Sequence, residues 1–194
     1  NSGSTMTTLN SVTGPIDSAN LGFTLMHEHV LIAASGLTHS YPDLLGPNYE
    51  ARAIDCLKKA KANDIDTMLD ATTFDLGRDP KLLQRVAAAS GVNLINVTGW
   101  WLDVPRFMQG VGANQMADEF IRDLTEGFRG TDIKAGMLKC AADFEGVTAP
   151  LETMARAVAR AHLQTGAPIM VHSYPTGHVA RRQIQIFREE GVDL

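Results

Sequence analysis

Residues 23–30 read FTLMHEHV, and residues 31–36 continue LIAASG. The first run is short and apolar and is followed by turn residues, so it predicts a buried β-strand. The continuation lacks the glycine-rich turn that follows the first strand of a nucleotide-binding open sheet. Polar side chains lie instead within the strand and at its end, where barrel active sites are built. This stretch therefore favours a (β/α)8 TIM barrel over a doubly wound open sheet.

The rest of the chain repeats a strand and a helix in alternation. Further short apolar runs predict strands at residues 67–70, 94–98, 136–140 and 169–172. Amphipathic patterns predict helices at residues 49–62, 79–91, 115–128, 149–165 and 177–190. Five strand–helix units in succession are typical of an α/β protein with a parallel sheet.

The composition excludes several classes of protein. With 44% hydrophobic and 20% charged residues, the chain of 194 residues can build one packed domain. No apolar run approaches the ~18–20 residues of a membrane span, so we expect no membrane partner. A net charge of -5 argues against a nucleic-acid partner. Cys56 and Cys140 are too few for a disulfide framework, so we expect a cytoplasmic protein.

Two histidines of the first strand form the first candidate metal-binding pair. His27 and His29 are two residues apart, so they point to the same face of the strand and Glu28 points to the other. Two imidazoles arranged in this way can hold one divalent cation. Structural roles through hydrogen bonds are an equally good interpretation of this spacing alone.

Lys139 and His172 are the other unusual strand residues. Lys139 lies in an apolar run, residues 135–141, where a charged amine would be costly to bury. It could extend to solvent at the strand end, or it could be a neutral amine that reacts with carbon dioxide to form a metal-bridging carbamate. His172 ends the fifth predicted strand; a structural role is common for such a histidine, but in a barrel it would converge with the others.

Taken together, these motifs resemble the phosphotriesterase family of the amidohydrolase superfamily, which includes aryldialkylphosphatases and phosphotriesterase-like lactonases. The similarity runs in order from Gly14 to Leu194. The matching stretches are residues 14–16, 22–29, 73–79, 98–103, 135–139 and 171–173.

The resemblance implies a hydrolase with a binuclear metal centre, most commonly zinc, with cobalt, manganese or iron as alternatives. His27 and His29 would bind the more buried metal and His172 the more exposed one. Lys139, modified by carbon dioxide to N6-carboxylysine, would bridge both metals as a catalytic residue. A hydroxide between the metals would attack a small-molecule phosphotriester or lactone. We also expect a homodimer.

Other polar and aromatic residues receive secondary roles. Trp100 and Trp101 follow the third strand, and we expect both to bind substrate, with ordinary packing as the alternative. The resemblance suggests that Trp101 lines the pocket for the leaving group or acyl chain. For one segment after the second strand we expect a buried salt bridge or a loop-anchoring role rather than catalysis: Asp75, Arg78 and Asp79. The remaining histidines are expected to lie outside the metal site: His39, His162 and His178.

The length conflicts with a complete barrel. The family pattern continues with a histidine on strand six and an aspartate on strand eight, and neither is in this sequence. Eight units of this size would need about 100 more residues. We therefore expect residues 6–194 to be the N-terminal part of one barrel hydrolase domain and residues 1–5 to be an expression-tag scar. The alternative is a non-catalytic, degenerate barrel or incomplete fragment that binds a partner, although four intact ligand residues argue against decay.

Overall fold

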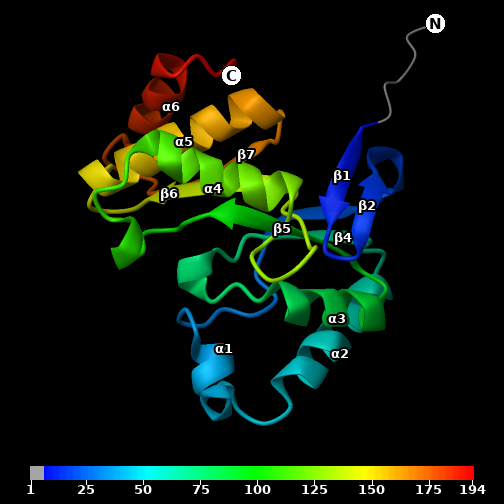
Figure 1. Ribbon diagram of the computed structural model, residues 1–194. Helices are drawn as coiled ribbons and strands as arrows, with labels where there is room; N and C mark the ends of the chain where they lie inside the picture. The colour runs from blue at the N-terminus through cyan, green and yellow to red at the C-terminus, as the bar shows by residue number, and fades with distance from the viewer. Residues whose placement is uncertain (1–6) are drawn as a thin grey trace, which may run out of the picture.

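A curled parallel sheet forms the centre of the protein, as the computed structural model, which describes residues 7–194, shows in Figure 1. Its strands lie in chain order, β3-β4-β5-β6-β7. They are β3 (Thr24–Glu28), β4 (Thr67–Asp70), β5 (Asn93–Gly99), β6 (Met137–Ala142) and β7 (Ile169–Ser173). The five predicted strands and the α/β class are confirmed, and the sheet corresponds to the first five strands of a TIM barrel. The predicted tag scar, residues 1–5, lies outside the described residues.

A helix follows each strand, as predicted. These helices are α2 (Tyr49–Lys61), α3 (Pro80–Ser90), α4 (Ala113–Thr125), α5 (Ala149–Thr165) and α6 (Val179–Glu189). Local signals set several ends: the Asp79 carboxylate accepts a hydrogen bond from Leu82 N at 3.0 Å, and Gly91 takes a left-handed conformation after α3. In Figure 1, α2 and α3 lie together at the bottom of the view and α4, α5 and α6 at the top.

Short elements that the sequence did not predict complete the structure. Within residues 7–194 the loops contain one helical turn, α1 (Leu37–Ser40), and four 3-10 turns: η1 (Ser18–Asn20), η2 (Pro42–Leu45), η3 (Phe74–Leu76) and η4 (Arg106–Met108). Before the sheet, β1 (Thr8–Ser11) and β2 (Gly14–Asp17) form an antiparallel hairpin. Of the two, β1 lies beside β5 (Figure 1).

The hairpin covers the N-terminal end of the sheet. Asn10 Nδ2 donates hydrogen bonds to Leu124 O at 3.1 Å and to Ala135 O at 2.9 Å. The backbone N–H of buried Val12 donates to Leu94 O at 2.9 Å. These contacts close the end of the strands that lies away from His172, so the open end of the sheet is the one that carries the candidate site.

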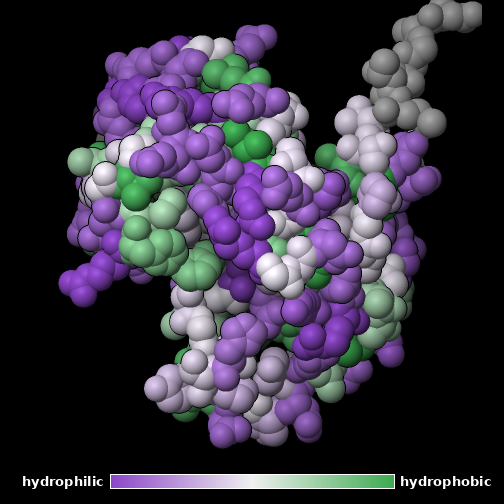
Figure 2. Space-filling view, in the orientation of Figure 1, coloured by the Kyte–Doolittle hydropathy of each residue, from purple (hydrophilic) through white to green (hydrophobic). Residues whose placement is uncertain are grey.

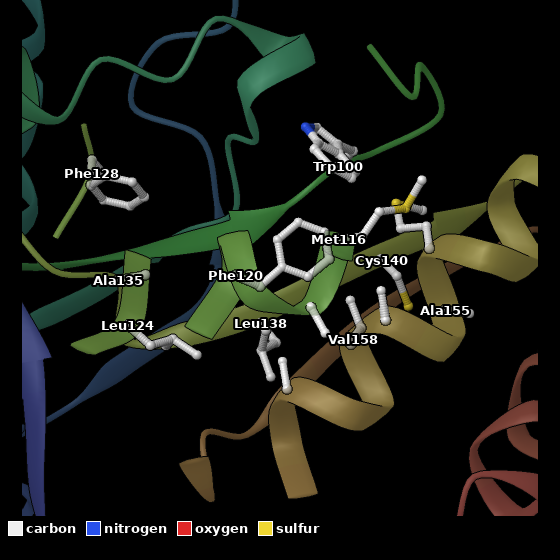
Figure 3. Packing of buried hydrophobic residues seen from close by; sticks show 14 of the residues in the cluster. Trp100, Met116, Phe120, Leu124, Phe128, Ala135, Leu138, Cys140, Ala155 and Val158 are labelled. Atoms are coloured by element: carbon white, nitrogen blue, oxygen red, sulfur yellow. The ribbon is translucent and has the colours of Figure 1, made fainter. Parts of the chain in front are cut away.

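The two faces of the sheet have different cores, because strand residues alternate between faces. One face packs against the helices, and Figure 3 shows side chains of α4 and α5 meeting over β6, with Phe120, Leu138 and Val158 among them. The other face carries a smaller apolar cluster of Leu69, Ile95, Val97 and Met137. Lys139 follows Met137 by two residues in β6, so it belongs to this second, inner face.

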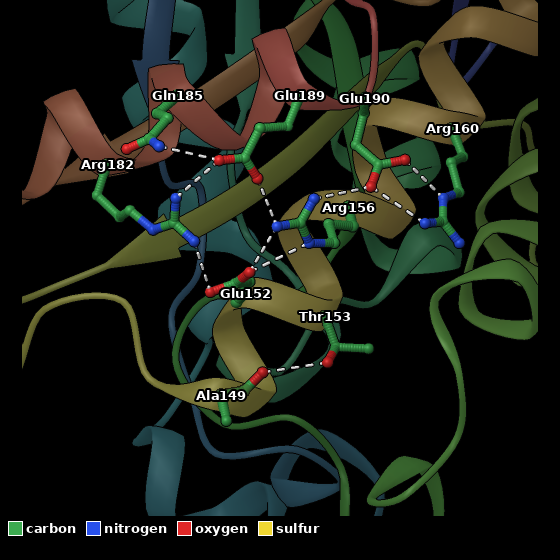
Figure 4. Close-up of polar contacts among 9 residues, drawn as sticks. All are labelled: Ala149, Glu152, Thr153, Arg156, Arg160, Arg182, Gln185, Glu189 and Glu190. Carbon is green, nitrogen blue, oxygen red and sulfur yellow. Dashed lines mark hydrogen bonds and ion pairs between the residues drawn. The ribbon is translucent and has the colours of Figure 1, made fainter.

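The surface is mainly polar in the view of Figure 2, where hydrophilic residues cover most of the visible face and hydrophobic areas are small and separate. An ion-pair network joins α5 to α6, and Figure 4 shows Arg156 at its centre. Within residues 7–194, no helix combines the length and the apolar character needed to cross a membrane.

Candidate metal centre

Two of the predicted ligands touch although their strands are not neighbours. Lys139 Nζ lies 2.9 Å from His27 Nε2. Lys139 is in β6 and His27 in β3, and two strands, β4 and β5, separate them in the sheet. Strands in a flat sheet lie about 4.8 Å apart, so β3 and β6 would be about 14 Å apart. The contact therefore requires the sheet to curl, with both side chains on its concave inner face.

The amine of Lys139 is enclosed. Its side chain is only 1% exposed, which excludes extension into solvent at the strand end. Besides His27, its hydrogen-bond partner is the Met170 sulfur at 3.5 Å. Burial lowers the pKa of Lys139 to about 8, because the surroundings disfavour the charged form, although Asp70 and Asp75 act in the opposite direction. A substantial neutral fraction is therefore accessible to this amine near neutral pH.

The two histidines at the end of β3 lie side by side. Their ring centroids are 5.6 Å apart, and His29 Nδ1 lies 2.9 Å from the hydroxyl of Thr72. Burial, followed by the charges of Lys139, His27 and His172, lowers the pKa of His29 to about 4. Burial and Lys139 also lower the pKa of His27. Both rings are therefore neutral at pH 7, which is the form that binds metals.

His172 approaches the same group from β7. Its charge contributes to the lowered pKa values of His27 and His29, so the three imidazoles interact electrostatically. His172 Nε2 lies 3.0 Å from Asp143 Oδ2, and its ring meets that of Trp101 at 78° with centroids 5.9 Å apart. All four predicted ligands thus gather at the C-terminal end of the sheet.

The two adjacent tryptophans point to opposite sides of the sheet, Trp101 to the candidate site and Trp100 to the helices. Trp101 contacts His172 and lies at the candidate site. Trp100 is 6% exposed and packs edge-on against Phe120 of α4, with ring centroids 4.8 Å apart, as Figure 3 shows. The expectation that Trp100 binds substrate at the metal centre is therefore corrected: its side chain belongs to the layer between sheet and helices.

The Asp75–Asp79 segment holds a loop and forms a largely buried ion pair, the two roles predicted for it. The Asp75 carboxylate accepts hydrogen bonds from the backbone N–H groups of Trp101, Leu102 and Asp103 at 3.0–3.2 Å. Arg78 pairs with Asp123 at 3.6 Å and lies over the Phe128 ring at 4.0 Å, while Asp79 caps α3. None of these contacts is made to the histidines or Lys139.

The remaining histidines lie outside the site. His39 and His178 are exposed in α1 and at the start of α6. His162 Nδ1 lies 2.8 Å from Ala167 O at the end of α5. Among residues 7–194, none of the three forms a hydrogen bond with His27, His29, Lys139 or His172.

Two polar residues at the site were missed from the sequence. Thr72 follows β4 and contacts His29, and Asp143 follows β6 and contacts His172. Both lie within two residues of the end of a strand, at the end of the sheet where active sites form, and that position was the available signal.

The residues present fit a divalent metal centre under one chemical condition. Among residues 7–194, no three His, Cys, Asp or Glu side chains gather closely enough to hold a metal ion by themselves. The candidate ligands are instead three imidazoles and the buried amine of Lys139. A carbamate on Lys139 would add the oxygen ligands and negative charge that the set lacks, and the lowered pKa of this amine favours that modification.

Comparison with known proteins identifies the family. A model of the phosphotriesterase family matches residues 7–194. The chain is 43% identical over 200 residues to the phosphotriesterase homology protein of Mycobacterium tuberculosis, with 97% of this chain and 61% of that protein covered. It is 37% identical over 181 residues to the aryldialkylphosphatase of Saccharolobus solfataricus, with coverage of 92% and 58%.

A more distant relative carries a different name. The chain is 25% identical over 214 residues to the human N-acetyltaurine hydrolase, with coverage of 95% and 61%. The chain thus spans about three fifths of the length of the curated relatives it matches. The match over residues 7–194 establishes that the chain belongs to the phosphotriesterase family.

Proposed function

We propose that the protein is a metal-dependent hydrolase that cleaves an ester bond in a phosphotriester or a lactone. The observation that carries this proposal is the 2.9 Å contact between the buried Lys139 amine and His27, with His29 and His172 at the same end of the sheet. A buried amine among imidazoles has no evident role in stabilising the fold, because desolvating it costs free energy. It has a clear role if it becomes an anionic metal ligand.

The residues that would hold the metals follow from this arrangement. His27 and His29 would bind one divalent ion and His172 a second, with carboxylated Lys139 shared between them; zinc is the first choice for such nitrogen ligands. When bound, such ions polarise a substrate oxygen and lower the pKa of water. The protein keeps the imidazoles of His27 and His29 neutral and buries Lys139.

The modification of Lys139 is chemically balanced. The neutral amine attacks the carbon of carbon dioxide, one C=O electron pair moves to oxygen, and the nitrogen releases a proton to solvent. With a pKa of about 8, roughly a tenth of the amine is neutral at pH 7, far more than for an exposed lysine. The positive charge of the ammonium is replaced by a carbamate, which can pair with divalent cations.

An apolar group of the substrate would pack against the ring of Trp101. Its ring contacts His172, and its backbone is held by Asp75, so an aromatic surface lies next to the proposed metal ligand. The name of the Saccharolobus relative favours a phosphotriester, and the lactone remains the second substrate class. The human relative's name adds N-acetyltaurine, an amide, to the substrates to be compared.

Substitution of Lys139 tests the proposal. We expect Lys139→Ala to lower kcat/KM by at least about 100-fold, with partial recovery when acetate is added, because a free carboxylate can replace the carbamate. Lys58→Ala, which removes an exposed amine from α2, is the matched control and should retain full activity.

Labelling and a substrate panel complete the experiment. Protein equilibrated with ¹³C-bicarbonate should show one carbamate carbon by NMR, which Lys139→Ala abolishes. Activity should be compared on a paraoxon-like triester, acyl-homoserine and simple lactones, and N-acetyltaurine. Undiminished ester hydrolysis by Lys139→Ala would overturn the role given to this residue, and a metal-free protein without hydrolase activity would favour the non-catalytic alternative.

A further inference from the structure

The carboxylate of Asp143 is fixed at both oxygens. Oδ2 lies 3.0 Å from His172 Nε2, and Oδ1 accepts a hydrogen bond from the Phe144 N–H at 2.8 Å. The hydrogen bond from Phe144 fixes the rotation of the carboxylate, so Oδ2 is directed at the imidazole of His172. Asp143 lies in the loop that follows β6, and His172 lies in the neighbouring strand β7.

The charge of Asp143 determines where the imidazole proton lies. Oδ1 already accepts a hydrogen bond from the Phe144 N–H, and Oδ2 faces the ring nitrogen at 3.0 Å, so both carboxylate oxygens lie in acceptor positions. An ionised carboxylate only accepts hydrogen bonds. Nε2 of His172 must therefore donate, and in the neutral ring Nδ1 then carries the lone pair. Within residues 7–194, Nδ1 of His172 takes part in no hydrogen bond.

Other contacts restrict His172 without touching its nitrogens. The His172 carbonyl accepts a hydrogen bond from Gln183 Nε2 at 3.1 Å, and Gln183 is 2% exposed in α6. The ring itself meets Trp101, whose backbone N–H donates to Asp75 at 3.0 Å. The His172 backbone is thus held from α6 and the ring face from the loop after β5, and among residues 7–194 only Asp143 hydrogen-bonds to a ring nitrogen of His172.

We infer that Asp143 is a positioning residue, which keeps the proton of His172 on Nε2 and presents Nδ1 as the nitrogen that binds a metal. The inference rests on the proposed metal-dependent function, because it assigns a partner to one of the proposed ligands. Carboxylates that hold the second nitrogen of a metal-binding histidine orient the ring and increase its basicity, and their loss weakens metal binding about 10–100-fold.

Metal affinity in matched variants tests the inference. We expect Asp143→Ala to raise the Zn²⁺ dissociation constant of the weaker site about 10–100-fold, measured by competition with a chromophoric chelator. Asp143→Asn keeps an acceptor oxygen and should recover part of the affinity. Glu145→Ala removes the same charge from an exposed position of the same loop and should change the affinity less than about twofold.

A metal-free measurement separates this inference from the proposed function. Long-range ¹H–¹⁵N spectra of the metal-free wild-type protein at pH 8 should show His172 protonated at Nε2 and bare at Nδ1. Protonation at Nδ1, or unchanged Zn²⁺ affinity in folded Asp143→Ala, would overturn the role of Asp143. A wild-type protein that binds no Zn²⁺ would overturn the proposed function instead, and the spectra test Asp143 even if the alanine variant fails to fold.

Discussion

At the scale of single residues, one carboxylate holds the loop that carries Trp101. Asp75 accepts hydrogen bonds from three successive backbone N–H groups, those of residues 101–103. Backbone N–H groups in a loop have no partners from regular secondary structure, so this carboxylate satisfies them in place of water. The position of the Trp101 ring beside His172 depends on this contact.

Asp75→Ala should therefore destabilise the protein and also release the loop that places Trp101 at the site. Hydrogen bonds to a charged group contribute about 1.5–3 kcal/mol, so we expect a loss of about 2–3 kcal/mol in the free energy of unfolding, measured with urea. Asp103→Ala, an exposed change in the same loop, should stay within about 0.5 kcal/mol of wild type. Equal stabilities for the two variants would contradict the role of Asp75.

The sequence predicted the four central site residues but not their partners. His27, His29, Lys139 and His172 were recognisable because polar side chains are unusual in buried strands. Asp143 and Thr72 lie in loops. Asp143 contacts a histidine that is 29 residues away in the sequence, and Thr72 contacts one that is 43 residues away, and no local pattern encodes such pairs. The two tryptophans are adjacent, so the sequence alone could not show which one faces the site.

At the scale of elements, a close approach between β5 and β6 positions Lys139. Gly99 ends β5 with a φ of 114° and pairs in register with Lys139. A Cβ at this position would overlap the Lys139 carbonyl oxygen. Only glycine allows both this backbone conformation and this contact.

Gly99→Ala should disturb the sheet directly beside the site. The unfavourable backbone conformation alone costs about 1–3 kcal/mol, and the overlap adds to it, so we expect a lower melting temperature and weaker metal binding. Gly112→Ala, at the N-cap of α4, meets no atom within 4 Å and has an ordinary φ of -74°, so it should cost only about 0.5–1 kcal/mol, the usual cost of alanine at an N-cap. Wild-type stability of Gly99→Ala would contradict the geometry of this strand pair.

The helices α5 and α6 are joined by a network of ion pairs, drawn in Figure 4. Arg156 pairs with Glu152 at 2.6 Å, Glu189 at 2.6 Å and Glu190 at 3.0 Å. Hydrogen bonds from arginines lower the pKa of all three glutamates. Their contribution to stability is therefore present above their unfolded pKa of about 4.3 and is lost as the pH falls through the lowered values.

Arg156→Ala should show this pH dependence. We expect a lower melting temperature than wild type at pH 7, and a difference that shrinks towards pH 3 as the glutamates become protonated in both proteins. Arg181→Ala, an exposed arginine on α6, should have little effect at either pH. A difference that stays constant from pH 7 to pH 3 would show that the lost packing of Arg156, rather than its charge, is responsible.

Elements were predictable where local signals define them. The five strands and five helices follow from hydrophobic periodicity and from caps such as Asp79 and Gly91. The N-terminal hairpin escaped prediction because distant contacts hold it: Asn10 is bonded to carbonyls 114 and 125 residues further along the chain. Such contacts leave no local pattern in the sequence.

At the scale of the whole molecule, curvature of the sheet creates the site. The ligands come from β3, β6 and β7, and only a curled sheet brings His27 within 2.9 Å of Lys139. The hairpin covers the opposite end of the strands, so the polar cluster and the open end coincide. The barrel-type fold and the candidate metal centre are therefore consequences of one arrangement.

Metal content tests the central claim most directly. Elemental analysis of the protein, reconstituted with Zn²⁺ in bicarbonate buffer and desalted, should find about two divalent ions per chain, as in two-metal hydrolases. The same treatment should leave Lys139→Ala with substantially less metal and Lys58→Ala with the wild-type content. A folded wild-type protein that retains no divalent metal would contradict the account.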